Sequence, residues 1–361
     1  MANILAVCWK GHSEFDPNSK SISKETESFK KNIAKIDSDA GHIEPKIKDG
    51  KKSLEMIEKE LREKYNENTI MLSMDHAVTY PGLKAAKIKD LALIVFDQHM
   101  DIYSYRTHGK SLNRANIFRI ALDKNLVSKI IFVGTRKSES ALFRKVKGLP
   151  KHIEASAARD RNAGIFAGVD DKVEIILSEE LDSFEHGLFK ALGILKKEGF
   201  KNIGIDIDLD VFDSKKILGV EYNDNSATEL LNSFLGKKGL KITSELKSKV
   251  EELRNGIKNN ADKRIIQKKA LELLSKIKDG RKSKVDGLEW ALDEFLWYSQ
   301  QQSEKGITPI IPQSLREKLN EKLKANGQKL CYRGITEWIP SNDANSQTDV
   351  LVRKLIGSLF L

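Results

Sequence analysis

Two short segments of the chain place carboxylates, in one of them together with a histidine, directly after an apolar run. The sequence DQHMD follows the run LALIVF, and DLDVFD follows NIGIDI. Side chains alternate faces along a strand, so Asp97, His99 and Asp101 are expected to project one way, as are Asp208 and Asp210. Gathering like charges is unfavourable unless a cation lies among them. The pattern therefore indicates a metal site.

Two further strand-like runs end in residues of the same kind. His76 follows the run at 69–74, and Glu337 follows the run at 332–336. Two imidazoles with several carboxylates form an oxygen-rich site that suits Mn²⁺ better than a structural Zn²⁺. The ligands are too many for one ion. Two bridged cations ~3.5–4 Å apart would use them all and would generate a hydroxide near neutral pH.

These segments resemble four motifs of the ureohydrolase family of arginases, agmatinases and formiminoglutamases. In chain order, SMDHA at 73–77 resembles GGDHS, DQHMD resembles DAHxD, DIDLDVFDS at 206–214 resembles SxDxDxxDP, and EWIP at 337–340 resembles ExxP. GTR at 134–136 is similar to the family's G-x-R. Within the third motif the spacing D-x-D-x-x-D fits only Asp208, Asp210 and Asp213, so Asp206 takes the family's serine position.

The resemblance implies two Mn²⁺ per subunit, or other divalent ions in their place. One ion would be held by His76, Asp97, Asp101 and Asp208, and the other by His99, Asp97, Asp208 and Asp210. It also implies that Asp101 orients a hydroxide held between the ions. Glu337 would accept hydrogen bonds from the planar guanidinium or amidine that is attacked, since a carboxylate pairs with such a fork through two bonds.

The proton donor and the substrate contacts are less closely matched. The family places a histidine some fifteen residues beyond the DAHxD histidine, where this chain has Arg114. An arginine is not a general acid of normal strength, so His108, nine residues beyond, is the candidate donor. Tyr103 resembles the residue found after the DAHxD motif in agmatinases. This resemblance favours, as substrate, a guanidino or amidino compound with an amine or otherwise non-amino-acid tail. Arg114 or Lys110 could instead bind a carboxylate of the substrate, so a formimino or guanidino acid remains an alternative substrate.

Four positions depart from the family motifs. Ser73 and Met74 replace a glycine pair, Gln98 replaces an alanine, and Ser214 replaces a proline. The ligands are kept while the walls of the site differ. This pattern fits a divergent binuclear hydrolase of linear C–N bonds, a manganese-dependent amidinohydrolase acting on a small guanidino or amidino substrate.

Short apolar runs alternate with amphipathic stretches over the first 213 residues. This alternation predicts an α/β fold of three layers, with helices on both faces of a mostly parallel, arginase-like sheet. Strands are expected at 4–9, 69–74, 91–97, 129–134, 173–177, 202–208 and 329–336, and helices at 23–36, 53–64, 81–88, 113–124, 138–146, 179–197 and 348–360. In such sheets ligands bind beyond the carboxyl ends of the strands, where the acidic segments fall.

A Lys-rich helical pattern interrupts this alternation. Residues 1–213 and 329–361 are expected to form one catalytic domain, with 214–328 as a helical insertion in it. Residues 237–284 hold 16 Lys/Arg against 6 Asp/Glu, which accounts for the whole net charge of +10. A solvent-exposed helical face is enough to explain this excess of basic residues. The more specific hypotheses are a binding site for an anionic partner, such as a nucleic acid, or a contact between subunits. The alternative function is a catalytically altered arginase-fold protein that binds a partner through this insertion.

Composition limits the cellular setting. No apolar run approaches the ~20 residues that span a bilayer, so no membrane segment is expected. The run at 4–9 is short and is not preceded by basic residues, so it is not expected to be an export signal. Cys8 and Cys331 lie in strand-like runs and are expected to be buried thiols. A cytoplasmic location follows as the default, and the family resemblance suggests a homotrimer or hexamer.

Overall fold

The protein is described by a computed structural model. It describes residues 3–9, 19–37, 39–45, 50–102, 112, 116–136, 171–212, 248–253, 255, 266, 268–273, 306–338 and 347–361. The chain divides into two compact units, Met1–Glu221 with Lys305–Leu361, and Tyr222–Glu304. The domain boundaries expected from the sequence, at 214 and 328, stay a prediction.

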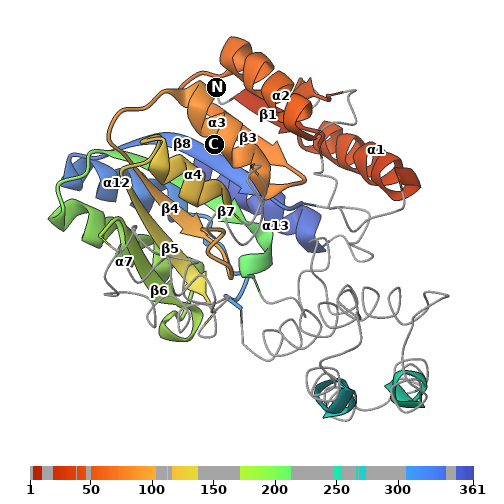
Figure 1. The fold of residues 1–361 in the computed structure, drawn as a ribbon. Coiled ribbons are helices and arrows are strands. Elements are labelled where there is room, and N and C mark those ends of the chain that lie inside the picture. Colours follow the sequence, from red (N-terminus) through yellow and green to blue (C-terminus); the bar gives the residue numbers. More distant parts are fainter. Residues whose placement is uncertain are drawn as a thin grey trace. The chain divides into compact units, whose positions relative to one another are not determined.

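The first unit is built on one sheet of eight strands (Figure 1). The strands are β1 (Asn3–Val7), β2 (Gly41–Ile43), β3 (Thr69–Ser73), β4 (Leu91–Phe96), β5 (Lys129–Thr135), β6 (Val173–Leu177), β7 (Asn202–Asp208) and β8 (Lys329–Thr336). They lie in the order β2-β1-β3-β8-β7-β4-β5-β6, and every pairing is parallel. The predicted parallel sheet is confirmed. The short edge strand β2 was not predicted.

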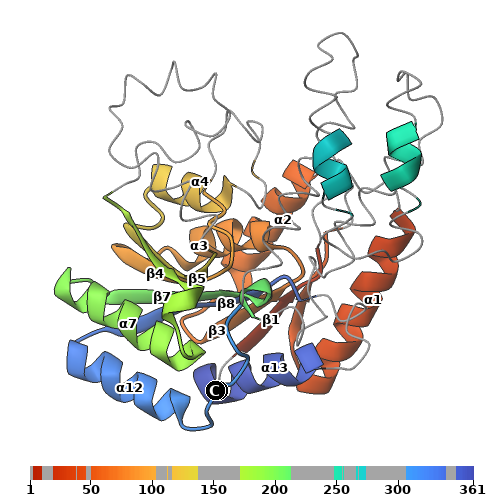
Figure 2. The same cartoon turned by 90° about the horizontal axis from the view of Figure 1, so that it is seen from below.

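Helices cover both faces of this sheet (Figure 2). On one face lie α2 (Gly50–Lys64), α3 (Thr79–Ala86) and α4 (Ile117–Asp123), and on the other α1 (Ser19–Ile36), α7 (Phe184–Lys197), α12 (Leu315–Asn326) and α13 (Gln347–Leu355). Alternate side chains of a buried strand point to opposite faces of the sheet. In β4, Leu93 and Val95 therefore belong to one apolar cluster, and Ile94 and Phe96 belong to the other. The three-layer α/β/α fold is confirmed.

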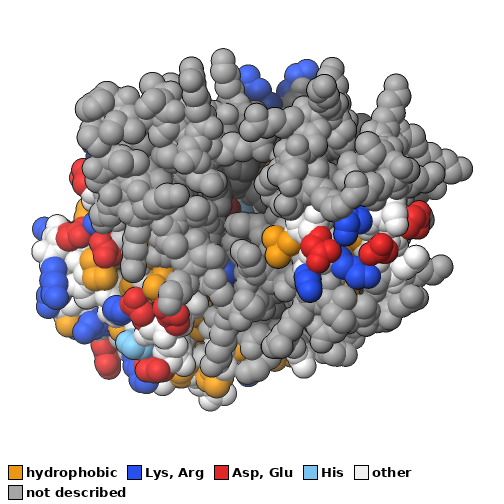
Figure 3. All heavy atoms as spheres, turned by 60° about the horizontal axis from the view of Figure 1, so that its bottom comes forward, with side chains coloured by type: hydrophobic (Ala, Val, Ile, Leu, Met, Phe, Trp, Pro, Cys, Tyr) orange, Lys and Arg blue, Asp and Glu red, His pale blue; other side chains and the backbone are white. Residues whose placement is uncertain are grey.

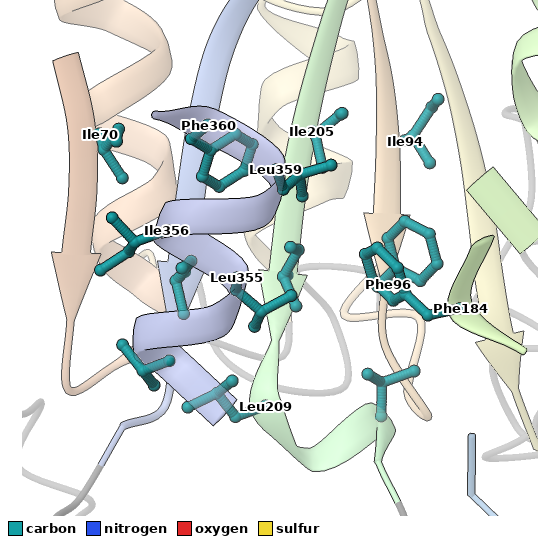
Figure 4. Packing of buried hydrophobic residues seen from close by; sticks show 14 of the residues in the cluster. Ile70, Ile94, Phe96, Phe184, Ile205, Leu209, Leu355, Ile356, Leu359 and Phe360 are labelled. Carbon is teal, nitrogen blue, oxygen red and sulfur yellow. The ribbon is translucent and has the colours of Figure 1, made fainter. Parts of the chain in front are cut away.

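The last residues of the chain pack on the face of the sheet that α1, α7 and α12 cover. After α13 the helix widens into a π-helical turn at Ile356–Phe360. Leu355, Leu359 and Phe360 pack with Ile205 of β7 in the same buried cluster (Figure 4). Burying a side chain of this size contributes roughly 1.5–3 kcal/mol, so this closing segment is part of the core that holds the central strands.

The second unit is described over two helical stretches, 248–253 and 268–273. Leu253 and Leu273 are fully buried, and Lys249 Nζ lies 3.4 Å from Glu272 Oε2. The helix expected at 138–146 and most of the basic segment 237–284 lie outside the described residues. Charged side chains of both signs are interspersed over the described surface in Figure 3. Among the described helices, none is long and apolar enough to cross a membrane.

Candidate metal centre

Four adjacent strands deliver the acidic and imidazole groups to one edge of the sheet. In the sheet order, β3, β8, β7 and β4 are consecutive neighbours. Phe96 of β4 pairs with Ile207 of β7, so Asp97 and Asp208 are the next residues along these two strands. Asp208 in turn pairs with Thr336, the residue before Glu337. Parallel pairing therefore places the carboxyl ends of these strands side by side.

The segment after β4 is a turn and not a continued strand. β4 ends at Phe96, and the Asp97 carboxylate accepts the His99 backbone N–H at 2.6 Å. Asp101 has a positive φ of 43°, a left-handed conformation that is uncommon outside glycine. Strand alternation beyond Phe96, as expected from the sequence, is therefore wrong. Asp97, His99 and Asp101 converge because a side-chain-capped turn curls back over the strand end.

The segment after β7 turns in the same way. Asp208 caps a 3₁₀ turn at Leu209–Val211, and its Oδ1 accepts the Asp210 backbone N–H at 2.9 Å. Asp210 therefore lies in this turn and not on a continued strand face, so strand alternation is wrong here too. The Gln98 backbone N–H points at Asp210 Oδ1 across 3.5 Å, which links the two turns. Asp208 and Asp210 are 2% and 6% exposed, so both carboxylates are withdrawn from bulk water.

His76 begins a 3₁₀ turn after β3 and is completely buried. Asp75 caps this turn by accepting the Ala77 backbone N–H at 2.8 Å. The Phe118 ring of α4 meets the imidazole edge to face, with centroids 5.1 Å apart. Phe118 also donates its backbone N–H to the Asp101 carbonyl at 3.1 Å. The start of α4 thus orients two of the predicted metal-binding residues.

Three carboxylates meet one nitrogen of His76. Its Nδ1 lies 3.0 Å from Asp208 Oδ2, 3.2 Å from Asp101 Oδ2 and 3.5 Å from Asp97 Oδ2. Ligand atoms of His76, Asp97 and Asp208 all lie within 4.8 Å of one another. One N–H cannot serve three carboxylates, whereas a divalent ion can bind them together.

A second group of ligands adjoins the first. His99 Nδ1 lies 2.8 Å from Asp210 Oδ2 and 3.6 Å from Asp97 Oδ1. Ligand atoms of Asp97, His99 and Asp210 again fall within 4.8 Å of one another. Asp97 belongs to both groups, so its two oxygens face two neighbouring positions for a cation.

Glu337 joins the same edge from β8. Its backbone has a positive φ of 58°, and its side chain is 3% exposed. Trp338 anchors this strained position by donating its backbone N–H to the Ser73 carbonyl at 3.2 Å and its indole N–H to Asp349 at 3.2 Å. Ligand atoms of Glu337, Asp208 and Asp210 lie within 4.8 Å of one another, so this carboxylate faces the rim of the metal groups. Strain held by such anchors is a feature of functional sites.

The carboxylates of the site are held where their charges repel one another. Burial, and then the charge of Asp210, raises the pKa of Asp97 well above its usual range. The same two causes raise the pKa of Asp208 to about 7. Burial opposes ionisation of Asp210 too, but the adjacent His99 lowers the pKa of Asp210 to about 2. The site therefore holds several carboxylates close enough together to perturb one another's pKa.

The histidines respond in the opposite direction. Burial alone would lower the pKa of His76, but the carboxylates of Asp101, Asp206 and Asp208 raise it well above the usual value. Burial likewise opposes protonation of His99, and Asp210 and Asp97 outweigh it. Each imidazole is thus held among carboxylates that favour a positive charge at its position. Such environments are typical of functional sites.

The donor atoms fit divalent cations. Asp97 Oδ2 and both ring nitrogens of His76 are buried and make no well-formed hydrogen bond among the described residues. Buried polar atoms normally find a partner, so these atoms are suited to binding an ion. Their mixture of carboxylate oxygens and two imidazoles matches the preference of Mn²⁺ and similar ions.

Sequence comparison connects this geometry to a known family. The arginase family model matches residues 17–222, which is more than half of the chain. The chain belongs to the arginase family. A search of curated proteins gives no significant match.

Solved structures of this family share the fold. The agmatine ureohydrolase of Thermoplasma volcanium has a TM-score of 0.52 at 16% identity, with 99% of this chain and 88% of that chain covered. The formimidoylglutamase of Bacillus subtilis subsp. subtilis str. 168 has a TM-score of 0.51 at 14% identity, with 99% and 85% covered. At these identities the likeness establishes the arginase-like fold.

The structure accommodates three of the four departures from the family motifs. Ser73 and Met74 are fully buried, and the Ser73 hydroxyl donates to the Asp75 carbonyl at 3.0 Å. The Gln98 amide donates to the Phe212 carbonyl at 3.3 Å, which ties the turn after β4 to the turn after β7. Ser214 lies outside the described residues. The larger side chains thus take up internal contacts beside the ligands.

Some predicted site residues lie outside the described residues. These are Tyr103, His108 and Arg114, which were assigned to substrate binding and proton donation, and Asp213 of the third motif. The structure brings together the six predicted metal ligands and Glu337. It also places Asp206 against both His76 and Thr79, contacts that were not predicted from the sequence. The two-residue spacing of Asp206 and Asp208 on one strand was the available signal.

Proposed function

We propose that this member of the arginase family is a binuclear metal-dependent hydrolase of linear C–N bonds in a guanidino or amidino compound. The observation that carries the proposal is the convergence of two histidines and four aspartates, from the segments at the ends of β3, β4 and β7, into two ligand groups that share Asp97. Family membership supports the reaction class.

The six ligands divide into two sets in this proposal. One set is His76, Asp97, Asp101 and Asp208, and the other is His99, Asp97, Asp208 and Asp210, with Asp97 and Asp208 common to both. Two Mn²⁺ ions are the preferred occupants, because the donors are mostly hard carboxylate oxygens with one imidazole in each set. When bound, such ions lower the pKa of a coordinated water toward neutrality and supply the nucleophile.

Glu337 receives the substrate cation in this proposal. A guanidinium or amidinium presents two parallel N–H groups, which a carboxylate accepts through two bonds. Glu337 is buried beside Asp208 and Asp210, so the bound cation would be desolvated with its central carbon held at the ligand groups. Its strained backbone and the Trp338 anchor fix the direction of this contact.

Asp101 positions the attacking oxygen. Its carboxylate is partly exposed at the rim, 3.2 Å from His76 Nδ1, and its backbone is tied to α4 through the Phe118 N–H. From there Asp101 can accept a proton as the oxygen adds to the C–N carbon. The tetrahedral adduct then collapses, and the amine leaves with a proton. His108 stays the predicted donor of that proton.

The finer assignments stay proposals. Tyr103 and Arg114 are proposed to contact the substrate tail, with an amine or another non-amino-acid tail preferred. A trimeric or hexameric assembly, a cytoplasmic location and an anionic partner for residues 237–284 remain predictions from the sequence. None of them is needed for the chemistry of the strand-end site.

Metal analysis of the full-length protein tests the proposal first. About two Mn²⁺ per chain are expected, and Asp208→Asn should abolish their binding. Asp123→Asn is the matched control, because Asp123 is an exposed carboxylate on α4 outside the site. Urea, ammonia and formamide release from a panel of guanidino, amidino and formimino compounds then identifies the substrate. A protein that binds no divalent ion, or one that binds two and hydrolyses no compound of these classes, contradicts the proposal.

A further inference from the structure

Asp206 is a buried carboxylate next to the metal centre that the two ligand sets do not use. It lies on β7 two residues before Asp208, so both side chains project from the same face of the strand. Its side chain is 0% exposed. Thr79 Oγ1 of α3 donates to Asp206 Oδ2 at 2.7 Å, and His76 Nε2 lies 3.5 Å from the same oxygen.

The neighbouring strand leaves room for this carboxylate. Gly334 of β8 pairs with Asp206 across the sheet, and a Cβ at Gly334 would lie only 2.3 Å from Asp206 Oδ1. Any other residue at 334 would therefore displace the carboxylate. On the same strand, burial and then the charge of Asp206 raise the pKa of Tyr332 well above its usual value, so this neighbour stays neutral.

The imidazole of His76 is the ring that faces the Asp206 carboxylate. Among the described residues, no Lys or Arg side chain forms an ion pair with Asp206, and its ion-pair partner is His76. A buried carboxylate without a positive partner is costly, so its contact with His76 is central to its presence here.

The two nitrogens of His76 face different groups. Nδ1 points at Asp208 and Asp101, at 3.0 and 3.2 Å, whereas Nε2 points at Asp206. A metal-binding imidazole usually donates its second N–H to a carboxylate or carbonyl, which fixes the tautomer and makes the first nitrogen a better donor. The 3.5 Å separation is at the outer limit of a hydrogen bond, and a small rotation of the ring would close it.

We propose that Asp206 is the positioning residue of His76: it accepts the Nε2 proton, keeps the Nδ1 lone pair directed at the metal position, and adds a negative charge behind the ligand. The inference rests on the proposed metal-dependent function. It concerns a position at which the resembling family motif has serine, so the charge is a property of this chain. A site with this extra carboxylate binds the His76-side ion more tightly than the six ligands alone would.

Divalent-ion affinity of the full chain tests the inference, with Mn²⁺ as the probe in competition with a fluorescent chelator. Asp206→Asn keeps a carbonyl acceptor and removes the charge, and Asp206→Ala removes both. We expect binding of one of the two ions to weaken ~10–100-fold in Asp206→Ala, less in Asp206→Asn, and to stay unchanged for the other ion. Thr79→Val is the matched control: it removes the other donor to Asp206 Oδ2 and leaves the His76 contact, so its effect should be smaller.

Two further readouts separate positioning from a merely structural role. The melting temperature in excess chelator should be unchanged in Asp206→Asn, because asparagine keeps the shape of the side chain and an acceptor oxygen, while the rise on adding Mn²⁺ should shrink. In the diamagnetic Zn²⁺-loaded protein, ¹⁵N spectra of the histidines should show the proton of His76 on Nε2 in the wild type. Loss of that tautomer in Asp206→Ala supports the inference.

The outcomes distinguish this inference from the proposed function. If the wild type binds two ions and Asp206→Ala binds both with equal affinity, Asp206 has no positioning role and the proposed function stands. The inference is also overturned if Asp206→Asn lowers the melting temperature, relative to the wild type, by the same amount in chelator as in Mn²⁺. If the wild type binds no divalent ion, the proposed function and this inference fail together.

Discussion

Replacing Asp97 by asparagine should change the stability of the protein in opposite directions with and without metal. Asp97 is fully buried, and it belongs to both ligand groups. Its Oδ1 accepts the His99 backbone N–H, a bond that the asparagine carbonyl can keep. Its Oδ2 makes no well-formed hydrogen bond among the described residues. The substitution therefore removes a charge and a shared ligand with little change in shape.

The expected magnitudes follow from the size of the unit. The unit that holds the site has roughly 280 residues, so its unfolding entropy is about 0.6 kcal/mol per kelvin and 1 kcal/mol corresponds to about 1.7 °C. An ion present at 1,000 times its Kd adds about 4.1 kcal/mol, hence about 7 °C per site and about 14 °C for two. Asp97→Asn should lose this gain. In chelator, relief of a buried like-charge contact of about 1–3 kcal/mol should instead raise the melting temperature by about 2–5 °C.

Calorimetry of wild type, Asp97→Asn and the exposed control Asp123→Asn, each in excess EDTA and in excess Mn²⁺, measures both effects. The control should follow the wild type in both conditions. The reasoning is refuted if chelated Asp97→Asn melts well below the chelated wild type, since Asp97 would then be a structural anchor and not an uncompensated charge. A full metal-induced rise in Asp97→Asn would equally refute its role as a shared ligand.

Three further predictions concern positions around the core. Gly334→Ala should destabilise the protein by about 1–3 kcal/mol in chemical denaturation, because its Cβ would overlap Asp206; an unchanged unfolding midpoint would contradict this contact. Burial raises the pKa of Cys8 to about 12, which lowers its thiolate fraction at pH 8 about 1,000-fold relative to an ordinary thiol. Native Cys8 should then resist a thiol reagent that labels it after unfolding, and rapid native labelling would show the thiol to be accessible. Trp338→Phe should cost about 1–3 kcal/mol in the same denaturation assay through the lost N–H donor to Asp349, and Asp349→Asn, which keeps an acceptor, should cost less.

The sequence was most informative where short-range pattern decides structure. The run that forms β4, LALIVF, is continuously apolar, as a strand covered on both faces must be. The bounds of β4, β6, β7 and β8 agree with the prediction to within one residue. The edge strand β2 was missed because Gly41–Ile43 is too short for a periodic signal and its His42 is exposed. Glu179 and Glu180, expected to open a helix, lie in a 3₁₀ turn at Ser178–Glu180, because Ser183 caps α7 at its true start.

The surface against which helix α12 packs depended on contacts that no local pattern reveals. Helix α12 has the charged composition of the preceding Lys-rich segment and was expected to belong to it. In the structure Leu315, Leu319 and Leu323 lie in the apolar cluster of the first unit, on the face of the sheet that α7 covers. A three-residue apolar stripe predicts a helix but does not predict which surface it packs against.

The sequence alone determined the residue types of the site and the class of fold. Acidic and imidazole groups after apolar strands, in four family-like motifs, were sufficient to predict a parallel three-layer α/β protein with a metal-binding rim. The tertiary structure decided how these groups meet. The order β3-β8-β7-β4 makes neighbours of strands far apart in the chain, and turns capped by Asp97 and Asp208 bring the ligands together beyond the strand ends. Strand order and turn conformation depend on long-range packing, so only the folded chain revealed that Asp206 lies behind His76.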